Sequence, residues 1–321
     1  MRAVVIRQFG EPQLLKIEDV PTPQPQGDDL LVAVHAAAIN PSDVKNVAGV
    51  MHGTTLPRIP GRDFAGKVVG GSNDLMGREV FGTGGGLGFT RDGTHAEFVR
   101  VSRTDVTTKP SKLPMELAGA AGVTFVTAWS AIVTVSKAGP NDTAVILGAA
   151  GGVGSAAVQI AKAHGARVIG VVRLEEDANI VRKMGAVHVL NSKSVKLVDA
   201  VQELTAKRGA EIVFDTTGMM FPDAVEMAAM EGRIPVITAP KDGVASFNLR
   251  TLYRKALRVQ GIDSLRLSAA ECAVLLAKMS LHFDSGQFTV QGVEAYTLAD
   301  GVEAYVQAAK GGRRIVLRPH M

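Results

Sequence analysis

Residues 143–173 read TAVILGAAGGVGSAAVQIAKAHGARVIGVVR, and this stretch decides the fold. It opens with a short, apolar, β-branched run at 144–147, which is typical of a buried parallel strand. Three glycines follow in the spacing G-x-x-G-x-x-G, namely Gly148, Gly151 and Gly154. Apolar residues then recur at helical spacing, and a second apolar run at 168–172 follows. The sequence therefore predicts one strand–turn–helix–strand unit.

The glycines of this turn have a physical role. The pyrophosphate of a dinucleotide must lie against the backbone, and its charge meets free N–H groups at the positive end of the helix dipole. A glycine turn between a strand and a helix is the context that this fingerprint requires. The alternative is a tight turn in an α/β domain that binds no ligand. We predict that a dinucleotide contacts Gly148, Gly151, Gly152, Val153 and Gly154.

The residue that ends the second strand indicates which dinucleotide is bound. That position faces the adenosine ribose, where an acid would bond both hydroxyls of NAD. This chain has Arg173 there, which suits a 2′-phosphate and predicts NADPH. The alternative is a solvated arginine at a strand end, and Glu175 and Glu176 follow closely enough to change the preference.

The length and composition are those of an ordinary globular chain. With 321 residues we expect two domains and a sizeable core. The net charge of +4 comes from scattered basic residues, which argues against a nucleic-acid surface. Cys272 is the only cysteine, so a disulfide within the chain and a cysteine-based zinc site are excluded. Because the N-terminus lacks the apolar core of a signal peptide and no run reaches spanning length, we expect a cytoplasmic protein.

Turn residues and apolar runs divide the chain into two kinds of structure. Up to about residue 122, short strands alternate with Gly, Pro and Asp, as in a small, partly closed β-barrel. From residue 143, strands and helices alternate, which predicts a doubly wound parallel sheet and an α/β fold class, until the pattern breaks after about 263. The expected strands are 3–6, 30–37, 65–69, 79–81, 96–101, 187–190, 211–214, 234–238, 257–261, 293–298 and 314–317. The expected helices are 115–135, 175–184, 195–206, 221–230, 268–281 and 300–309.

Six motifs, in order along the chain, resemble the zinc-independent quinone oxidoreductase branch of the medium-chain dehydrogenase/reductase superfamily. They are AAINPSD at 37–43, PGRDFAG at 60–66, GTHAEFV at 93–99, AGVTFVTAWSAI at 121–132, GAAGGVGSAAVQIAKAHGARVIG at 148–170 and GGRRIVLRP at 311–319. The resemblance implies a GroES-like β-barrel catalytic domain, residues 1–122 and 263–321, and a Rossmann NADPH-binding domain, residues 123–262. It also implies an active-site cleft between the domains and a homodimer formed through the edge of the Rossmann sheet.

The alcohol dehydrogenases of this superfamily bind catalytic zinc through a Cys and a His-Glu pair. At the matching places this chain has Asn40 and the pair Arg62-Asp63. Neither asparagine nor arginine is a competent ligand where zinc requires thiolate, imidazole or carboxylate. We therefore expect no metal, and an acceptor that is already electrophilic. The Arg62-Asp63 pair is expected to form an ion pair in place of the metal.

Candidate catalytic residues follow from the same stretch. Asn40 either bonds the substrate or a ribose hydroxyl, or is a buried amide that holds the following turn. Lys45 either stabilises a developing enolate or hydroquinone anion, or is a solvated helix lysine. Related 2-enoyl thioester reductases carry a tyrosine proton donor where this chain has Met51, which cannot donate a proton. His52 could substitute if its loop folds inward.

Other candidates lie where the resemblance or the carboxyl ends of the strands place a cofactor. Asp43 is expected to cap the helix that follows Asn40. The candidate cofactor residues beyond the glycine turn and Arg173 are Thr127, Asn191, Thr217, Gly218, Thr238, Ala239, Gly261, Ile262 and Lys310. Met51 and Tyr253 are expected to shape the substrate pocket.

The resemblance and the residues together predict an NADPH-dependent, zinc-independent oxidoreductase. It transfers hydride to a quinone or to an α,β-unsaturated carbonyl (enone or enal), with a small-molecule substrate and no membrane partner. One alternative is a 2-enoyl thioester reductase, which a pocket long enough for an acyl chain would support. The other is a low-turnover NADPH- or RNA-binding protein.

Overall fold

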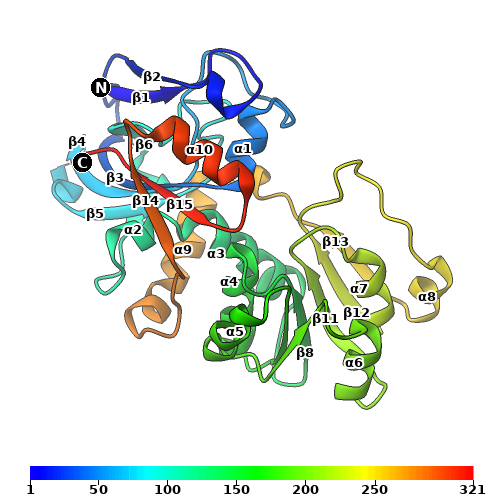
Figure 1. The fold of residues 1–321 in the computed structure, drawn as a ribbon. Coiled ribbons are helices and arrows are strands. Elements are labelled where there is room, and N and C mark those ends of the chain that lie inside the picture. Colours follow the sequence, from blue (N-terminus) through cyan, green and yellow to red (C-terminus); the bar gives the residue numbers. More distant parts are fainter. Residues whose placement is uncertain (72, 321) are drawn as a thin grey trace. The chain divides into compact units, whose positions relative to one another are not determined.

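The computed structural model describes residues 1–71 and 73–320, which form two compact units. Unit 1 comprises Met1–Val126 and Ser264–Met321, and unit 2 is the continuous segment Thr127–Asp263. The two ends of the chain therefore share unit 1, as the blue, cyan and red ribbons in Figure 1 show. In the described part of the chain, no helix combines the length and apolar character needed to cross a membrane.

Unit 2, all of whose residues are described, contains one parallel sheet of six strands in the order β10-β9-β8-β11-β12-β13. Counted along the unit, this order is 3-2-1-4-5-6. The direction in which successive strands are added to the sheet therefore reverses between β8 and β11. Ligands bind outside the carboxyl ends of the strands at such a point. The strands are β8 (Thr143–Leu147), β9 (Arg167–Val172), β10 (His188–Asn191), β11 (Ala210–Asp215), β12 (Ala228–Val236) and β13 (Arg258–Gly261).

Helices cover both faces of this sheet, as the sequence predicts for a doubly wound fold. In Figure 1, α4 and α5 lie on one side of the strands, and α6 and α7 lie on the other. The helices are α4 (Gly152–Ala163), α5 (Ala178–Met184), α6 (Leu197–Leu204), α7 (Phe221–Met227) and α8 (Leu249–Arg254).

The expected helix at 221–230 ends earlier than the sequence predicts. α7 ends at Met227, and β12 begins at Ala228, which has extended dihedral angles. Ala228 pairs with Ala210 of β11, and Glu231 adopts a left-handed φ of 57°. Pairing with the sheet therefore overrides the local helical preference of this segment.

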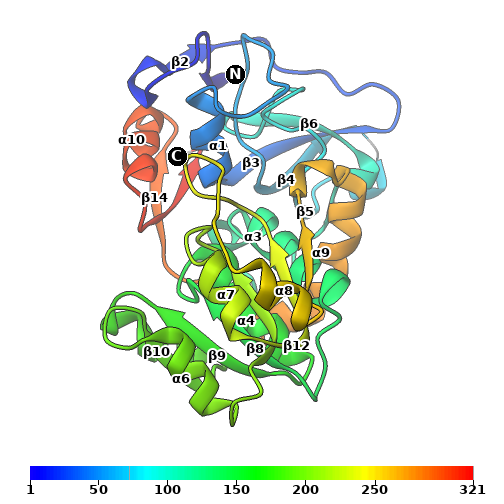
Figure 2. The ribbon, with the colours of Figure 1, turned by 90° about the vertical axis from the view of Figure 1, so that its right-hand side faces the viewer.

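Unit 1 is built around β3, which pairs with three other strands. In the described residues of unit 1, one sheet has the order β14-β15-β3-β4-β5-β7, with β6 also paired to β3, and β1 and β2 form a separate hairpin. Figure 2 shows α10 alongside β14, at the side of this sheet. The strands are β1 (Arg2–Val5), β2 (Lys16–Asp19), β3 (Asp29–Ile39), β4 (Phe64–Gly70), β5 (Glu79–Gly82), β6 (Phe98–Ser102), β7 (Thr107–Thr108), β14 (Val293–Thr297) and β15 (Arg314–Arg318).

The expected single helix at 115–135 is broken. It consists of α2 (Met115–Ala118), α3 (Gly122–Trp129) and a π-helical turn (Ser130–Val135). At the break, Gly119 approaches β3 so closely that a Cβ would lie 2.5 Å from the carbonyl oxygen of Ala36. The other helices of unit 1 are α1 (Pro41–Val47), α9 (Ala269–Asp284) and α10 (Gly301–Lys310).

Each unit has its own apolar core. In unit 2, the strand residues Val145, Ile169 and Val213 share one cluster with Val201 of α6 and Val225 of α7. In unit 1, one cluster lies on β3, β4 and β6, and a second joins β1, α1, α10 and β15. These cores hold the ends of the strands, where the candidate site residues lie.

Candidate functional site

The glycine turn of unit 2 is closed by a backbone contact that only glycine permits. Gly148 follows β8 with a left-handed φ of 77°. A Cβ on Gly154 would lie 2.1 Å from the carbonyl oxygen of Gly148, so the first turn of α4 rests directly on the end of β8. The sequence prediction of a strand–glycine turn–helix unit is therefore confirmed.

The start of α4 fits a pyrophosphate. Gly151 is the N-cap and is exposed, and Gly152 and Val153 at the start of the helix are half-buried. The first turn carries no acidic residue, so its N–H groups and the helix dipole present positive charge. The turn brings together all five glycine-turn residues that the sequence singles out.

Arg173 is exposed directly after β9, and none of the hydrogen bonds or ion pairs between described residues involves it. Of the acids that follow, Glu175 accepts a hydrogen bond from Nδ2 of Asn191 at 3.1 Å. The side-chain oxygen of Asn191 in turn accepts from the backbone of Lys193 at 3.0 Å. Asn191 is thus engaged in local bonds, while the guanidinium of Arg173 is free to meet an anion.

A cavity of about 320 Å³ lies at the carboxyl ends of β11, β12 and β13. Four of its lining residues are predicted cofactor residues: Gly218, Thr238, Ala239 and Gly261. A Cβ on Gly218 would lie 2.9 Å from Cγ2 of Thr238, so the loops after β11 and β12 touch. The lining is largely apolar, which suits a flat aromatic ring.

Asp215, at the end of β11, organises the loop beside this cavity, and the sequence analysis missed it. Its carboxylate accepts hydrogen bonds from the backbone of Thr217 at 2.8 Å, the hydroxyl of Thr217 at 2.7 Å and the backbone of Met220 at 2.7 Å. The Thr217 hydroxyl is therefore occupied within the loop. The sequence signal that could have identified this turn is an aspartate directly before Thr-Thr-Gly at the end of a strand.

The remaining predicted cofactor and pocket residues are placed as follows. Thr127 is buried in α3, and Ile262 is half-buried and donates its N–H to the Val236 carbonyl at 2.8 Å. Tyr253 is 61% exposed on α8 in unit 2. Lys310 ends α10 in unit 1 and is exposed.

In unit 1, Asn40 is held by two carboxylates. Its backbone N–H donates to Oδ2 of Asp43 at 2.7 Å, which closes the start of α1 as the sequence predicts for Asp43. Its side-chain Nδ2 donates to Oδ2 of Asp63 at 3.0 Å. Asn40 is 6% exposed. The side chain is thus fixed by its donor to Asp63 and by the capping box, in which it faces the backbone N–H of Asp43.

The expected ion pair between Arg62 and Asp63 is wrong. The Arg62 guanidinium donates to the Oγ and carbonyl oxygen of Ser264 at 3.3 and 3.2 Å, and lies 5.8 Å from the centre of the Phe89 ring. Asp63 instead accepts from Asn40 and from the backbone of Val123 at 2.8 Å. Consecutive side chains in extended backbone point to opposite sides, so these two neighbours face different partners.

Arg314, at the start of β15, is a further charged group near this carboxylate that the sequence analysis did not single out. It is half-buried, and burial lowers its pKa while the Asp63 carboxylate opposes that shift. Burial also raises the pKa of Asp63, and its hydrogen bonds and the Arg62 charge oppose the rise.

A buried polar chain lies behind α1. His95 Nε2 is 3.1 Å from the carbonyl oxygen of Ala38, which can only accept, so Nε2 carries the proton and donates. Nδ1 is then the acceptor for the Tyr305 hydroxyl at 2.7 Å. Burial lowers the pKa of His95 to about 4 and raises that of Asp43 to about 7. Oδ1 of Asp43 has no hydrogen-bond partner among the described residues, which fits a protonated carboxyl.

Lys45, Met51 and His52 lie apart from the buried face of α1. Lys45 is exposed, two residues and so about 200° around the helix from Asp43. Met51 is half-buried and His52 is exposed in the loop that follows. That loop is tied to α1 because the Thr54 hydroxyl donates to Oδ1 of Asn46 at 2.5 Å.

The donor set at Asn40, Arg62 and Asp63 does not fit zinc. The Asn40 amide bonds Asp63, Arg62 bonds Ser264, and Asp63 is the only anionic oxygen donor of the three. Across residues 1–71 and 73–320, no group of three or more His, Cys, Asp or Glu side chains could hold a metal ion.

Two family models match the chain. The model of the alcohol dehydrogenase GroES-like domain matches residues 26–111, in unit 1. The model described as zinc-binding dehydrogenase matches residues 152–280, most of which lie in unit 2.

Full-length relatives agree with these matches. The chain is 38% identical over 281 residues to a zinc-type alcohol dehydrogenase-like protein of Schizosaccharomyces pombe, which covers 86% of this chain and 82% of that protein. It is 27% identical over 328 residues to the quinone oxidoreductase of Homo sapiens, covering 99% and 98%. A solved structure of an NAD-dependent alcohol dehydrogenase, 28% identical, superposes with a TM-score of 0.91 and covers 99% of this chain and 100% of that chain. The predicted α/β fold with a GroES-like domain is confirmed.

The buried chain predicts a pH dependence that one substitution exposes. Between about pH 4 and 7 the folded protein keeps a proton on Asp43 that the unfolded chain releases, so this group makes the free energy of unfolding fall as pH rises. Between about pH 4 and 6.5 the unfolded chain binds a proton on His95 that the folded protein does not, so this group makes the free energy of unfolding rise. The two slopes oppose each other. In Asp43→Asn only the His95 slope remains. From pH 4 to 6.5 the free energy of unfolding of this variant should therefore rise with pH more steeply than that of the unsubstituted protein, by up to about 1.4 kcal/mol per pH unit.

Urea unfolding at half-unit pH steps measures this difference. His95→Gln is the matched control, because it removes the opposing group and should give the opposite change in slope. Equal slopes in the Asp43→Asn variant and the unsubstituted protein would contradict the assignment.

Proposed function

The chain belongs to the quinone oxidoreductase branch of the medium-chain dehydrogenase/reductase superfamily and is an oxidoreductase; from this premise we propose that it is an NADPH-dependent, zinc-independent reductase of quinones or α,β-unsaturated carbonyls. The observation that carries the proposal is the combination of an intact phosphate-binding turn with a donor set at Asn40, Arg62 and Asp63 that does not fit zinc. Without a Lewis acid to activate an alcohol, reduction of an electrophilic acceptor is the favoured direction.

Residues of unit 2 account for cofactor binding in this proposal. NADPH supplies the hydride. The N-terminus of α4 binds the pyrophosphate, and Arg173 pairs with the 2′-phosphate. The cavity at the strand ends is the proposed site for an aromatic ring of NADPH. One of its walls is formed by Gly218, Thr238, Ala239 and Gly261. The further proposed contacts are Thr127, Asn191, Thr217 and Ile262 of unit 2 and, outside this unit, Lys310.

Residues of unit 1 account for the acceptor side. Asn40, whose side chain is held by Asp63 and by the start of α1, is the proposed contact to the substrate or a ribose hydroxyl. The exposed side chains of Lys45 and His52 are the groups able to stabilise negative charge on the reduced acceptor or to donate a proton. Met51 of this unit and Tyr253 of unit 2 are each proposed to contact the substrate. Holding the two reactants in line supplies much of the rate, because orientation can lower a barrier by about 7–11 kcal/mol at best.

The proposal predicts oxidation of NADPH by quinones or short enones in the presence of EDTA. The measurement is absorbance at 340 nm with a panel of quinones, enones and one enoyl thioester. Turnover that disappears with EDTA and returns with zinc would refute the metal-independent mechanism. Preference for the enoyl thioester would favour the thioester reductase, and tight NADPH or RNA binding without turnover would favour a binding protein.

Arg173 should determine the choice of cofactor. Arg173→Gln removes one charge-assisted pair to the 2′-phosphate, so KM for NADPH should rise by about 10- to 100-fold while KM for NADH changes little. Arg182→Gln is the control, because Arg182 is an exposed arginine on α5 that donates to Asn179 of the same helix. An equal effect on both cofactors would show that Arg173 has been misread and that Glu175 or Glu176 sets the preference.

The edge of the unit 2 sheet is the proposed dimer contact. β13 is the last strand in the sheet order, and all four of its residues are exposed. Two copies of such an edge can pair and continue the sheet. The surface on this strand includes Val259, which is 42% exposed.

Light scattering should therefore give the mass of two 33.7 kDa chains. Val259→Lys should shift the protein toward monomer, because two lysines would meet across the paired edges. Val274→Lys, at an exposed position of α9 in unit 1, is the matched control and should leave the mass unchanged. A monomer without any substitution would rule out this contact.

A further inference from the structure

Arg314 stands next to Asn40 across two paired strands of unit 1. β15 and β3 are antiparallel, with Ile315 opposite Ile39. Asn40 continues β3 with extended dihedral angles, so the next pair in this register is Arg314 and Asn40. Opposite side chains in such a pair lie on one face of the sheet, with Cβ atoms about 4.5–5.5 Å apart. Because Ile315 and Ile39 belong to an apolar core cluster, Arg314 and Asn40 lie on the other face.

Arg314 has no partner, although it is half-buried. Its guanidinium forms no hydrogen bond or ion pair with any described residue. Its nitrogens are not among the fully buried side-chain atoms that lack a partner, so a ligand can reach them. A guanidinium carries five N–H donors, which need acceptors where water is partly excluded. The other arginines of unit 1 that are not exposed each have a partner: Arg58 with Asp92, Arg62 with Ser264, Arg91 with Asp105, and Arg318 with Glu116.

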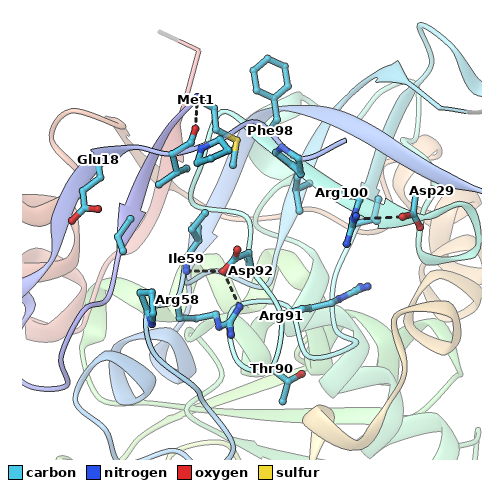
Figure 3. Close-up of a pocket in the computed structure, with 18 of the residues that line it drawn as sticks. Met1, Glu18, Asp29, Arg58, Ile59, Thr90, Arg91, Asp92, Phe98 and Arg100 are labelled. Carbon is cyan, nitrogen blue, oxygen red and sulfur yellow. Dashed lines mark hydrogen bonds and ion pairs between the residues drawn. The ribbon is translucent and has the colours of Figure 1, made fainter. Parts of the chain in front are cut away.

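A hollow of about 680 Å³ beside β6 illustrates how this unit balances its arginines. Dashed lines in Figure 3 mark two ion pairs along its wall: Arg58 with Asp92 at 2.8 Å, and Arg100 with Asp29 at 3.5 Å. Each of these lining arginines meets a lining carboxylate, whereas Arg314 meets none.

The charges around Asn40 include one positive charge in excess. Arg62 and Arg314 both act on the carboxylate of Asp63. The two oxygens of that carboxylate already accept hydrogen bonds from Asn40 and from the backbone at the start of α3. Below about pH 7 the carboxyl of Asp43 keeps its proton, because burial raises its pKa. Two guanidinium groups thus face a single carboxylate, and the half-buried excess charge favours an anionic group on a ligand.

Burial separates Arg314 from the other cations of the acceptor side. Lys45 and His52 are exposed, and Arg62 donates to Ser264. A charge acts more strongly where water is partly excluded, and a donor that is already in place needs no reorganisation during the reaction. In addition, a guanidinium does not lose its proton in proteins, so this charge is present at every assay pH.

We propose that Arg314 is a catalytic residue of the reductase: it binds the carbonyl oxygen of the acceptor and stabilises the negative charge that this oxygen gains. This inference rests on the proposed function. The guanidinium would take the place of the Lewis acid that Asn40, Arg62 and Asp63 cannot hold.

The step that Arg314 assists balances as follows. Hydride from NADPH forms a C–H bond at a ring carbon of a quinone or at the β-carbon of an enone, and the π-bond at that carbon breaks. Its electron pair moves through the conjugated system to the carbonyl oxygen, and the reductant is left as NADP⁺. Arg314 donates hydrogen bonds to this oxygen until a proton from water completes the reduced product.

Steady-state kinetics at saturating NADPH, with one quinone and one enone, tests the role of Arg314. Arg314→Gln should lower kcat by about 100- to 1000-fold, as the removal of one oxyanion donor does. The Kd for NADPH, measured by isothermal titration calorimetry, should change little. Arg313→Gln is the matched control, because Arg313 is the adjacent exposed arginine and pairs with Glu294, and it should keep kcat unchanged.

Chemical rescue separates a catalytic loss from a folding defect. Arg314→Ala should recover part of its activity when guanidinium chloride is added at a sub-denaturing concentration. Sodium chloride at the same ionic strength should have no such effect. Rescue requires a folded variant in which the added cation occupies the place of the missing side chain.

4-Nitrophenol gives a readout that does not depend on turnover. Bound to the complex with NADP⁺, its oxygen would take the position of the acceptor oxygen, and the charge of Arg314 should lower the pKa of the phenol below its value in water. The visible absorbance of the phenolate measures this pKa. The shift should be lost in Arg314→Gln and kept in Arg313→Gln.

An unchanged kcat in Arg314→Gln, no recovery with guanidinium, or a phenol pKa that does not depend on residue 314 would each overturn the proposal. A weaker Kd for NADPH without a loss of kcat would also overturn it, because Arg314 would then bind a phosphate of the cofactor. If the unsubstituted protein turns over no acceptor, the proposed function and this inference are refuted together. Normal turnover that is insensitive to Arg314 refutes this inference alone.

Discussion

One buried carboxylate, that of Asp63, fixes the starts of two helices. Asp63 bonds the side chain of Asn40 at 3.0 Å and the backbone of Val123 at 2.8 Å, and its own carbonyl oxygen accepts from the Thr94 hydroxyl at 2.7 Å. The starts of α1 and α3 are thus fixed by the same group. A Cβ on Gly122 would lie 2.4 Å from Oδ1 of Asp63, so α3 can begin this close to the carboxylate only because residue 122 is glycine. A buried charge is costly unless it is bonded in this way, and removing one partner would leave it uncompensated.

A polar side chain that already has a hydrogen-bond partner within the protein is less available to a ligand. In unit 2, the Thr217 hydroxyl is bonded to Asp215, and Asn191 is bonded to Glu175. In unit 1, Asn40 has committed its donor to Asp63. By contrast, the exposed N-cap of α4 and the guanidinium of Arg173 have no such side-chain partner among the described residues. A polar residue at a strand end is therefore a weaker predictor of a binding site than the glycine spacing, because its side chain can be used within the loop.

Sequence reasoning succeeded where a local steric rule determined the outcome. Gly154 must be glycine because α4 rests on the Gly148 carbonyl, so the spacing alone predicted the unit. It failed where the outcome depended on tertiary partners. The Arg62-Asp63 pair was predicted from adjacency, but each side chain bonds a residue far away in the chain, Ser264 and Val123. Likewise, the segment after Met227 has helical residues but pairs with β11, a contact that no local pattern records.

The open edge of β6 illustrates a related limit, since an edge becomes visible only when the sheet is assembled. Proteins protect such edges with prolines and charges, and both are present here. The prolines after β2 face the edge without donating to it, and the arginines stand along it. A second copy of β6 paired on this edge would bring arginines close to one another, and like charges on paired strands repel.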